Sequence, residues 1–184
     1  MSIFRLTDVA DATRQSPEYW NKRNEDLWGR QMHGHFLDDP KLIEEMDSRN
    51  FKVLDQIFND FCKVGKRDFH VLECACGIGR YTSHIVQKYL DYKVFYTGLD
   101  FASKNIEEAK HREKDNIKFY LSDMLSFKTE EKFDLIFMVA AMSSIEQNSK
   151  EIIDHLKTML TANGVIAIFE QSVYCVVDNV GVSK

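Results

Sequence analysis

The sequence predicts an α/β protein built on a doubly wound, mostly parallel sheet. Five short β-type runs alternate with helical stretches after residue 67, and strands that alternate with helices form parallel sheets. Two of these runs, Val94–Leu99 and Phe133–Val139, are apolar on both faces, which is typical of interior strands covered by helices on each side. A two-glycine turn, Gly77-Ile78-Gly79, follows the first run. In such sheets ligands bind outside the carboxyl ends of the strands, so we expect the site there.

Residues 1–66 are expected to form an N-terminal arm and a helix on the substrate side, and residues 67–184 the α/β core. After Pro40, apolar residues recur at three- and four-residue steps up to a stop at Gly65. This period predicts one amphipathic helix, or two joined near residues 48–50. The arm also carries aromatic side chains that either close over a ligand or pack on the sheet, namely Tyr19, Trp20 and Trp28.

The remaining elements follow in order along the core. The expected strands are Phe69–Cys74, Val94–Leu99, Ile117–Leu121, Phe133–Val139 and Val165–Phe169. Helices fit between them at about Tyr81–Leu90, Ser103–Arg112 and Lys150–Leu160.

Size, charge and cysteine usage exclude several classes. The chain has 184 residues, which is one domain with little left over. Its 24 basic and 29 acidic residues give a net charge of −5 with no basic stripe, so nucleic acid is a disfavoured partner. The longest uncharged apolar stretch, residues 135–142, is too short to cross a membrane. Four irregularly spaced cysteines and the absence of a leader pattern favour a cytoplasmic protein with reduced thiols.

Acidic residues stand where three of the expected strands end. Glu73 ends the first run, Asp100 ends the second, and Asp123 follows the third. A carboxylate at the position of Asp100 can accept hydrogen bonds from both ribose hydroxyls, and Asp123 with its neighbouring backbone can read an adenine edge. Gly77 and Gly79 let the backbone approach a ligand closely. The pattern favours a nucleoside site.

The identity of the nucleoside cofactor follows from charge. A dinucleotide fingerprint requires a third glycine where this chain has Thr82. Glu73 beside the loop disfavours a pyrophosphate and favours a ligand that carries an ammonium or sulfonium group. These two features favour S-adenosylmethionine over NAD.

At these residues the sequence resembles the class I S-adenosylmethionine-dependent methyltransferases of the small-molecule, UbiE-like type. The stretch from Val71 to Arg80 is similar to their glycine-rich first motif in its E-x-A-C-G-x-G variant. Four further stretches resemble their later motifs in order: residues 98–109, 116–124, 133–137 and 152–167. The resemblance implies a Rossmann-like methyltransferase fold and methyl transfer to a small-molecule acceptor by in-line displacement.

The resemblance also implies the site. The cofactor-binding residues would be Glu73, Ala75, Cys76, Gly77, Gly79, Asp100, Phe101, Asp123, Met124, Met138 and Val139. Glu73 and the two glycines would surround the methionine portion, Asp100 the ribose, Asp123 and Met124 the adenine, and Met138 and Val139 the sulfonium. No metal is expected.

An in-line displacement does not require a dedicated base. If the acceptor needs one, the candidates are His33, His35, Glu146 and Glu170. His33 and His35 are alternatively metal ligands, or residues of a surface loop.

The family continues beyond its fifth strand with a helix and a two-stranded hairpin, whereas 14 residues follow Glu170 here. We therefore expect C-terminal strands to be missing, with Val173–Val177 at most one more strand. An exposed apolar edge would then favour a homo-oligomer. The alternative to an active enzyme is a catalytically silent, methyltransferase-like binding or regulatory protein, or a truncated form. A third reading, an NAD-dependent oxidoreductase, lacks the third glycine.

Overall fold

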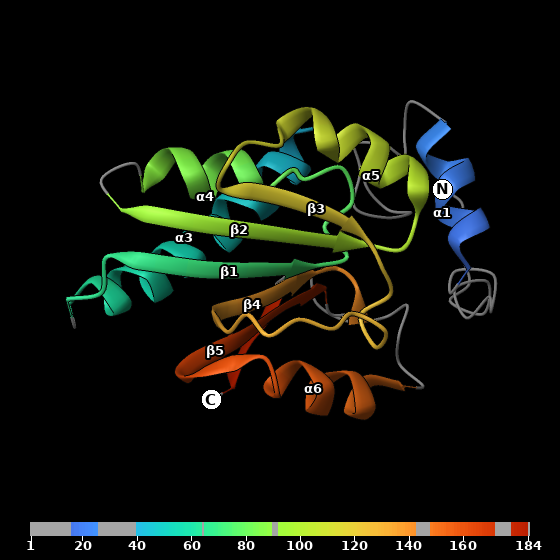
Figure 1. Cartoon of the computed structure of the whole chain (residues 1–184). Coiled ribbons are helices and arrows are strands. Elements are labelled where there is room, and N and C mark those ends of the chain that lie inside the picture. Colours follow the sequence, from blue (N-terminus) through green and yellow to red (C-terminus); the bar gives the residue numbers. More distant parts are fainter. Residues whose placement is uncertain are drawn as a thin grey trace.

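The computed structural model describes residues 16–25, 40–63, 65–89, 92–142, 148–171 and 178–183. These residues contain a six-stranded sheet in the order β3-β2-β1-β4-β5-β6 (Figure 1). The strands are β1 (Asp68–Cys74), β2 (Lys93–Asp100), β3 (Ile117–Leu121), β4 (Phe133–Val139), β5 (Leu160–Gln171) and β6 (Asp178–Ser183). The first five are parallel to one another, and β6 runs antiparallel to β5. The predicted α/β class with a mostly parallel sheet is confirmed.

Helices flank this sheet. They are α1 (Pro17–Glu25), α3 (Pro40–Lys63), α4 (Thr82–Lys88), α5 (Ser103–Ala109) and α6 (Ser149–Lys157), and a short 3-10 turn, η3 (Lys110–Arg112), continues α5. Helix α3 is continuous, so of the two readings of its period the single helix is correct. One face of α3 carries apolar side chains at helical spacing, and two of them, Leu54 and Phe58, are completely buried.

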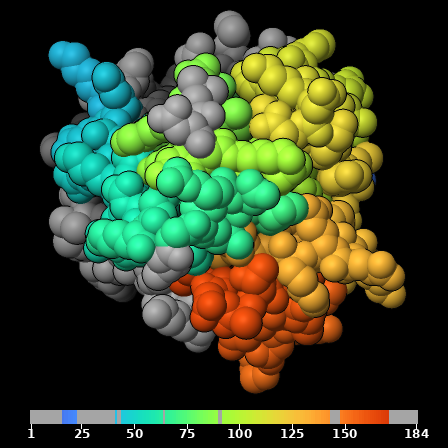
Figure 2. Space-filling model, turned by 60° about the vertical axis from the view of Figure 1, so that its left-hand side comes forward, coloured from blue at the N-terminus to red at the C-terminus, as the bar shows by residue number. Residues whose placement is uncertain are grey.

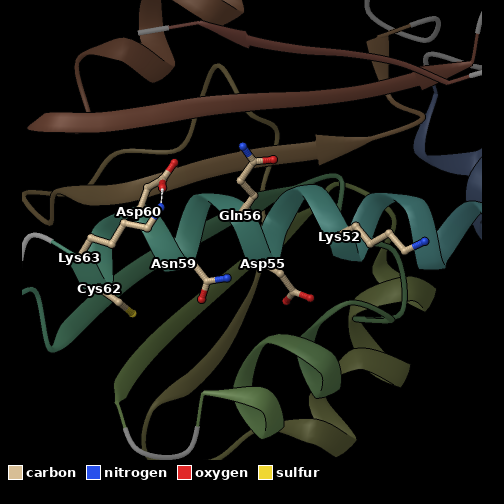
Figure 3. Close-up of a pocket in the computed structure, with 7 residues that line it drawn as sticks. All are labelled: Lys52, Asp55, Gln56, Asn59, Asp60, Cys62 and Lys63. Carbon is tan, nitrogen blue, oxygen red and sulfur yellow. Dashed lines mark hydrogen bonds and ion pairs between the residues drawn. The ribbon is translucent and has the colours of Figure 1, made fainter.

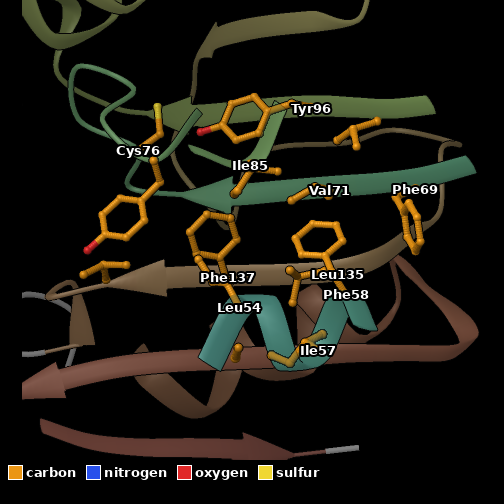
Figure 4. Packing of buried hydrophobic residues seen from close by; sticks show 14 of the residues in the cluster. Leu54, Ile57, Phe58, Phe69, Val71, Cys76, Ile85, Tyr96, Leu135 and Phe137 are labelled. Atoms are coloured by element: carbon orange, nitrogen blue, oxygen red, sulfur yellow. The ribbon is translucent and has the colours of Figure 1, made fainter. Parts of the chain in front are cut away.

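The two faces of the sheet are covered by different helices. Side chains of α3, α4 and α5 pack on the face that carries Val71, Tyr96 and Phe137 (Figure 4). Helix α6 packs on the opposite face, against Leu72 and Ile136. Because successive strand residues alternate between faces, β1 and β4 are buried on both sides, which explains their apolar runs.

The entry into β5 differs from the prediction. Helix α6 ends at Lys157 and β5 begins at Leu160, where the sequence predicted a helix through Leu160 and a strand from Val165. Phe133 pairs with Leu160 and Leu135 with Val165, so residues 161–164 form a bulge inside the strand. These residues have no partner in β4 and lie within β5 between two stretches that pair with it.

Strand β6 is one further strand after β5, which agrees with the expectation of at most one more, but it lies at Asp178–Ser183. It pairs with β5 from Asp178 opposite Gln171 to Ser183 opposite Ile166. This pairing covers the edge of β5 that we expected to be exposed. The sequence of β6, DNVGVS, has only two apolar residues at alternate positions, Val180 and Val182, which is too short an alternation to predict a strand. Residues 173–177, where a strand was considered, lie outside the described residues.

Candidate functional site

The strand order reverses between β1 and β4. Strand β1 pairs with β2 on one side and with β4 on the other, and both neighbours are parallel to it. The carboxyl ends of β1, β2 and β3 therefore meet at one edge of the sheet, the edge beside α1 in Figure 1. A reversal of this kind opens a crevice in which α/β proteins bind ligands.

The loop that leaves β1 at this edge, residues 75–81, is held in an unusual conformation. Ala75, Gly77 and Gly79 have φ angles of 55°, 54° and 75°. A Cβ on Gly79 would lie 2.9 Å from the Phe119 ring, so this ring closes one side of the loop. At Gly77 no described atom lies within 4 Å of the equivalent position, so this side offers room for a ligand.

Asp100, at the end of β2, joins the glycine loop to the start of α5. Its Oδ2 accepts a hydrogen bond from the backbone N–H of Gly77 at 2.9 Å. Its Oδ1 accepts from the N–H of Ala102 at 2.9 Å and from Nδ2 of Asn105 at 3.2 Å. Burial raises the pKa of Asp100, and these donors oppose that rise by stabilising the charged form. The structure thus brings together the loop and the acidic strand end that the sequence singled out.

Glu73 lies on the neighbouring strand and is 2% exposed. The hydroxyl of Tyr96 donates a hydrogen bond to its Oε2. Burial raises the pKa of Glu73 to about 8, although the Tyr96 hydroxyl and the charge of Arg80 favour the ionised form. Among the described residues, no cationic side chain forms an ion pair with Glu73 or Asp100. Two buried carboxyl groups therefore lie at the carboxyl ends of neighbouring strands, and their hydrogen-bond partners are uncharged.

Besides Ala75, a second non-glycine residue with positive φ lies at the carboxyl end of the neighbouring strand β4, and the sequence carries no signal for it. Ala140, directly after β4, has a φ of 52°. Its N–H donates to the carbonyl of Phe169 at 2.8 Å, and the N–H of Met142 donates to the Glu170 carboxylate. Positive φ in a residue with a Cβ costs about 1–2 kcal/mol, and such strain gathers at ligand sites. Glu170, one of the candidate bases, thus braces the chain that leaves β4.

The other predicted cofactor residues are placed as follows. Asp123 is exposed, and its Oδ1 accepts a hydrogen bond from the N–H of Leu125 at 2.8 Å. Met124 and Phe101 are partly buried, and Val139 is almost completely buried. Met138 has no exposed surface and packs on the α6 side, so any contact with a ligand must use its main chain.

The thiols near the loop are packed in the interior. Cys74 and Cys76 are free and buried, and the N–H of Cys76 donates to the carbonyl of Leu99 at 2.8 Å. Burial raises the pKa of the Cys76 thiol, which makes it unreactive. Their placement agrees with small buried residues at a strand end.

Several candidates lie outside the described residues, namely Trp28, His33, His35 and Glu146. Within the described part, no group of three or more His, Cys, Asp or Glu side chains is arranged to hold a metal. Its helices also include none with the length and apolar character needed to cross a bilayer.

A separate hollow runs along α3 (Figure 3). Its lining side chains come from this helix alone and are Lys52, Asp55, Gln56, Asn59, Asp60, Cys62 and Lys63. Asp60 pairs with Lys63 at 2.8 Å, and Asp55 accepts a hydrogen bond from Tyr89, directly after α4, at 2.9 Å. These contacts join helix residues to one another and leave the crevice at the strand ends as the candidate site.

The curated relatives are named as O-methyltransferases and as an N-methyltransferase. The chain is 31% identical over 108 residues to malonyl-[acyl-carrier protein] O-methyltransferase 2 of Ilyobacter polytropus, which covers 58% of this chain and 40% of the relative. It is 27% identical over 137 residues to pavine N-methyltransferase of Thalictrum flavum. This alignment covers 73% of this chain and 37% of the relative. The chain therefore spans about two fifths of the length of these relatives.

Solved structures share the fold. Magnesium protoporphyrin IX methyltransferase from Synechocystis PCC 6803 with bound SAM aligns with a TM-score of 0.67 at 16% identity, over 89% of this chain and 77% of that chain. The DhpI-SAH complex aligns with a TM-score of 0.57 at 18% identity, over 86% of this chain and 69% of that chain. At such low identities, these matches support the Rossmann-like methyltransferase fold and nothing finer.

The family is settled by the core of the chain. Residues 71–164, more than half of the sequence, match the family described as "Methyltransferase domain". This stretch runs from the middle of β1 through the glycine loop and Asp100 to the bulge in β5, so it contains the whole crevice. The chain belongs to the methyltransferase domain family.

Proposed function

We propose that this protein transfers a methyl group from S-adenosylmethionine to a small-molecule acceptor. The observation that carries the proposal is the pair of buried carboxyl groups, Glu73 and Asp100, beside the open side of Gly77. Since their described partners are uncharged, a ligand that brings positive charge and a ribose complements both. A pyrophosphate would instead meet two acidic groups without a neutralising cation.

The residues of the crevice fit this cofactor. When bound, S-adenosylmethionine would supply a methyl group on a sulfonium: an acceptor lone pair would attack the methyl carbon in line as the carbon–sulfur bond breaks, and S-adenosylhomocysteine would leave. Asp100 binds and orients the ribose, and Glu73 balances positive charge in the methionine portion. Asp123 and Met124 are proposed to bind the adenine. Alignment and exclusion of water are the main contributions of the chain to such a displacement.

We propose that the N-terminal arm supplies the acceptor side of the site. Helix α1 is joined to α5, because Asn21 Oδ1 accepts a hydrogen bond from the N–H of Lys104 at 3.0 Å. Helix α3 is joined to the glycine loop through Asp47, which pairs with Arg80 and accepts from the Tyr81 hydroxyl at 2.9 Å. The candidate bases His33 and His35 fall between these two helices in the sequence and lie outside the described residues. Glu146 is the third candidate base.

Calorimetric titration of the full chain with S-adenosylmethionine, S-adenosylhomocysteine and NAD tests cofactor binding. Hydrogen bonds to charged groups contribute about 1.5–3 kcal/mol each, so Asp100→Ala should weaken S-adenosylmethionine binding at least about tenfold. Asp115→Ala, which removes an exposed carboxylate from the turn before β3, is the matched control and should leave the affinity unchanged. Equal affinity in Asp100→Ala and the wild type would contradict the ribose contact, and binding of NAD alone would favour an oxidoreductase.

Turnover distinguishes the enzyme from a silent binding protein. The full chain is incubated with methyl-labelled S-adenosylmethionine and a panel containing a malonyl thioester, other carboxylates, tertiary amines and, as the disfavoured class, nucleic acid. The thioester and the amines are chosen because the relatives are named as O- and N-methyltransferases. Labelled product from a small molecule at enzymatic rate supports the proposal. Cofactor binding with no transfer across the panel favours a regulatory or binding role.

A further inference from the structure

Tyr96 occupies a position that the cofactor site depends on. In the register of β1 and β2, Glu73 faces Gly98, which has no side chain, and Tyr96 precedes Gly98 by two residues on the same face. The Tyr96 ring is 1% exposed and packs against the Phe119 ring with centroids 5.7 Å apart. Its hydroxyl points toward the carboxyl ends of the strands (Figure 4) and donates to Glu73.

The groups around Glu73 oppose one another. Burial and the neighbouring Asp100 disfavour its charged form, whereas the Tyr96 hydroxyl and Arg80 favour it. The Cys74 and Cys76 thiols, the other titratable groups near it, are buried. No described cation forms an ion pair with Glu73. A cationic ligand that binds beside it should therefore shift its carboxyl group toward the ionised form.

We propose that Tyr96 is a positioning residue for Glu73: its hydroxyl fixes the carboxyl group toward the cofactor and stabilises the carboxylate that forms when the cationic cofactor binds and one proton is released. The inference rests on the proposed function. In this step the O–H bond of the Glu73 carboxyl breaks, the proton passes to solvent, and the positive charge of the bound cofactor balances the carboxylate. The hydroxyl of Tyr96 keeps its own proton and donates it to the carboxylate as a hydrogen bond.

Proton release is measurable on the wild-type chain. Titration with S-adenosylmethionine at pH 6.5 in two buffers of different ionisation enthalpy gives the number of protons released. We expect close to one proton for the wild type and none for Glu73→Gln. At this pH an α-ammonium group remains largely protonated, and its contribution is common to both proteins. Wild-type binding without proton release overturns this inference and leaves the proposed function standing, whereas no binding at all overturns the proposed function.

Tyr96→Phe removes only the hydroxyl. Without this donor the charged carboxylate is less stable, so at pH 6.5 we expect about tenfold to a hundredfold weaker binding and fewer released protons. The difference in affinity between Tyr96→Phe and the wild type should narrow toward pH 9, where Glu73 is ionised in both proteins. Tyr120→Phe, at an exposed tyrosine on β3, is the matched control and should behave as the wild type. Equal weakening at every pH with unchanged proton release would show that Tyr96 is merely structural and overturn the inference.

Discussion

Carboxyl groups are buried at both ends of this sheet, but their partners differ. At the amino end, Asp134 of β4 is 2% exposed. It forms an ion pair with Lys66 at 3.0 Å and accepts from the N–H of His70 and the hydroxyl of Thr161, each at 3.0 Å. Figure 2 turns this end toward the viewer, where the blue-green start of β1 borders the orange residues before β4 and the orange-red start of β5. At the carboxyl end, Glu73 and Asp100 are hydrogen-bonded to uncharged donors only.

This difference separates a structural carboxylate from one kept for a ligand. Asp134 has its cation within the chain, so its charge holds β1, β4 and β5 together in the folded protein alone. Glu73 and Asp100 form no ion pair among the described residues, and the charge of Arg80 does not outweigh the burial of Glu73, so their ionised forms are unfavourable until a cationic ligand binds. Binding sites of this kind lower the stability of the ligand-free protein. Substitutions at the two ends of the sheet should therefore have opposite effects on stability.

The largest expected effect is the pH dependence of stability caused by Glu73. Its folded-state pKa of about 8 lies above the ordinary value of 4.5. Stability from the neutral carboxyl is therefore fully present below about pH 4.5 and is lost as pH rises toward 8, because only the unfolded chain releases the proton in that window. The loss is about 1.4 kcal/mol per pH unit, of order 4 kcal/mol between pH 5 and 8.

Glu73→Gln removes this titration. Urea unfolding at several pH values should show the variant equal to the wild type near pH 4.5 and more stable near pH 8, while its affinity for S-adenosylmethionine falls. Other titrating groups are common to both proteins and cancel in the difference. Parallel stability curves for the two proteins would contradict the view that Glu73 is held for a ligand at a cost in stability.

At the amino end the opposite result is expected. Lys66→Met leaves the Asp134 carboxylate buried without its cation, which should lower the free energy of unfolding by about 3 kcal/mol and Tm by about 6–12 °C. The lower end of the range for buried pairs applies because Lys66 is 35% exposed. Lys66→Met should leave cofactor affinity unchanged.

Two variants accompany this measurement. Lys63→Met removes the exposed pair with Asp60 and should change stability by less than about 1 kcal/mol. The double variant Lys66→Met/Asp134→Asn removes both charges and should recover part of the loss. If Lys66→Met is no more harmful than Lys63→Met, the ion pair at the amino end is not what distinguishes the two ends.

The sequence predicted those parts of the fold that depend on local pattern. The apolar runs of β1, β2 and β4 were located within one residue of their observed ends, because burial on both faces leaves a continuous signal. Strand β6 and the bulge at residues 161–164 were missed. Both arise from backbone pairing with β4 or β5, which requires no particular side chains.

The candidate site, like the fold, could be predicted only in part from the sequence. Strand ends in a parallel sheet meet at one edge, and the structure confirms that Gly77 lies against Asp100. The binding roles of Glu73, Gly77 and Asp100 stay a proposal. The contact of Tyr96 with Glu73 depends on the register between two strands, which no single strand encodes. The positive φ of Ala140 depends on tertiary contacts, and alanine gives no local signal for it.

The smallest effects concern two glycines, one near each end of the sheet. A Cβ on Gly98 would lie 2.6 Å from Cδ1 of Phe119 and 2.9 Å from Sγ of Cys76, so its neighbours are side chains. A Cβ on Gly164 would lie 2.7 Å from the backbone oxygen of Phe133. Each Gly→Ala change should lower the free energy of unfolding by about 1–3 kcal/mol through overpacking.

The two variants should differ in rescue. Adding Phe119→Leu to Gly98→Ala makes room beside the glycine loop, so stability should return in part, measured as a coupling energy by urea unfolding. No side-chain change can move the backbone oxygen that confronts Gly164, so Leu160→Ala should not rescue Gly164→Ala. Rescue at both positions, or at neither, would contradict the idea that adjustable side chains shape the ligand end while fixed backbone pairing shapes the amino end. A rescued Gly98→Ala chain that still binds S-adenosylmethionine weakly would show in addition that Phe119 supports the glycine loop in its binding conformation.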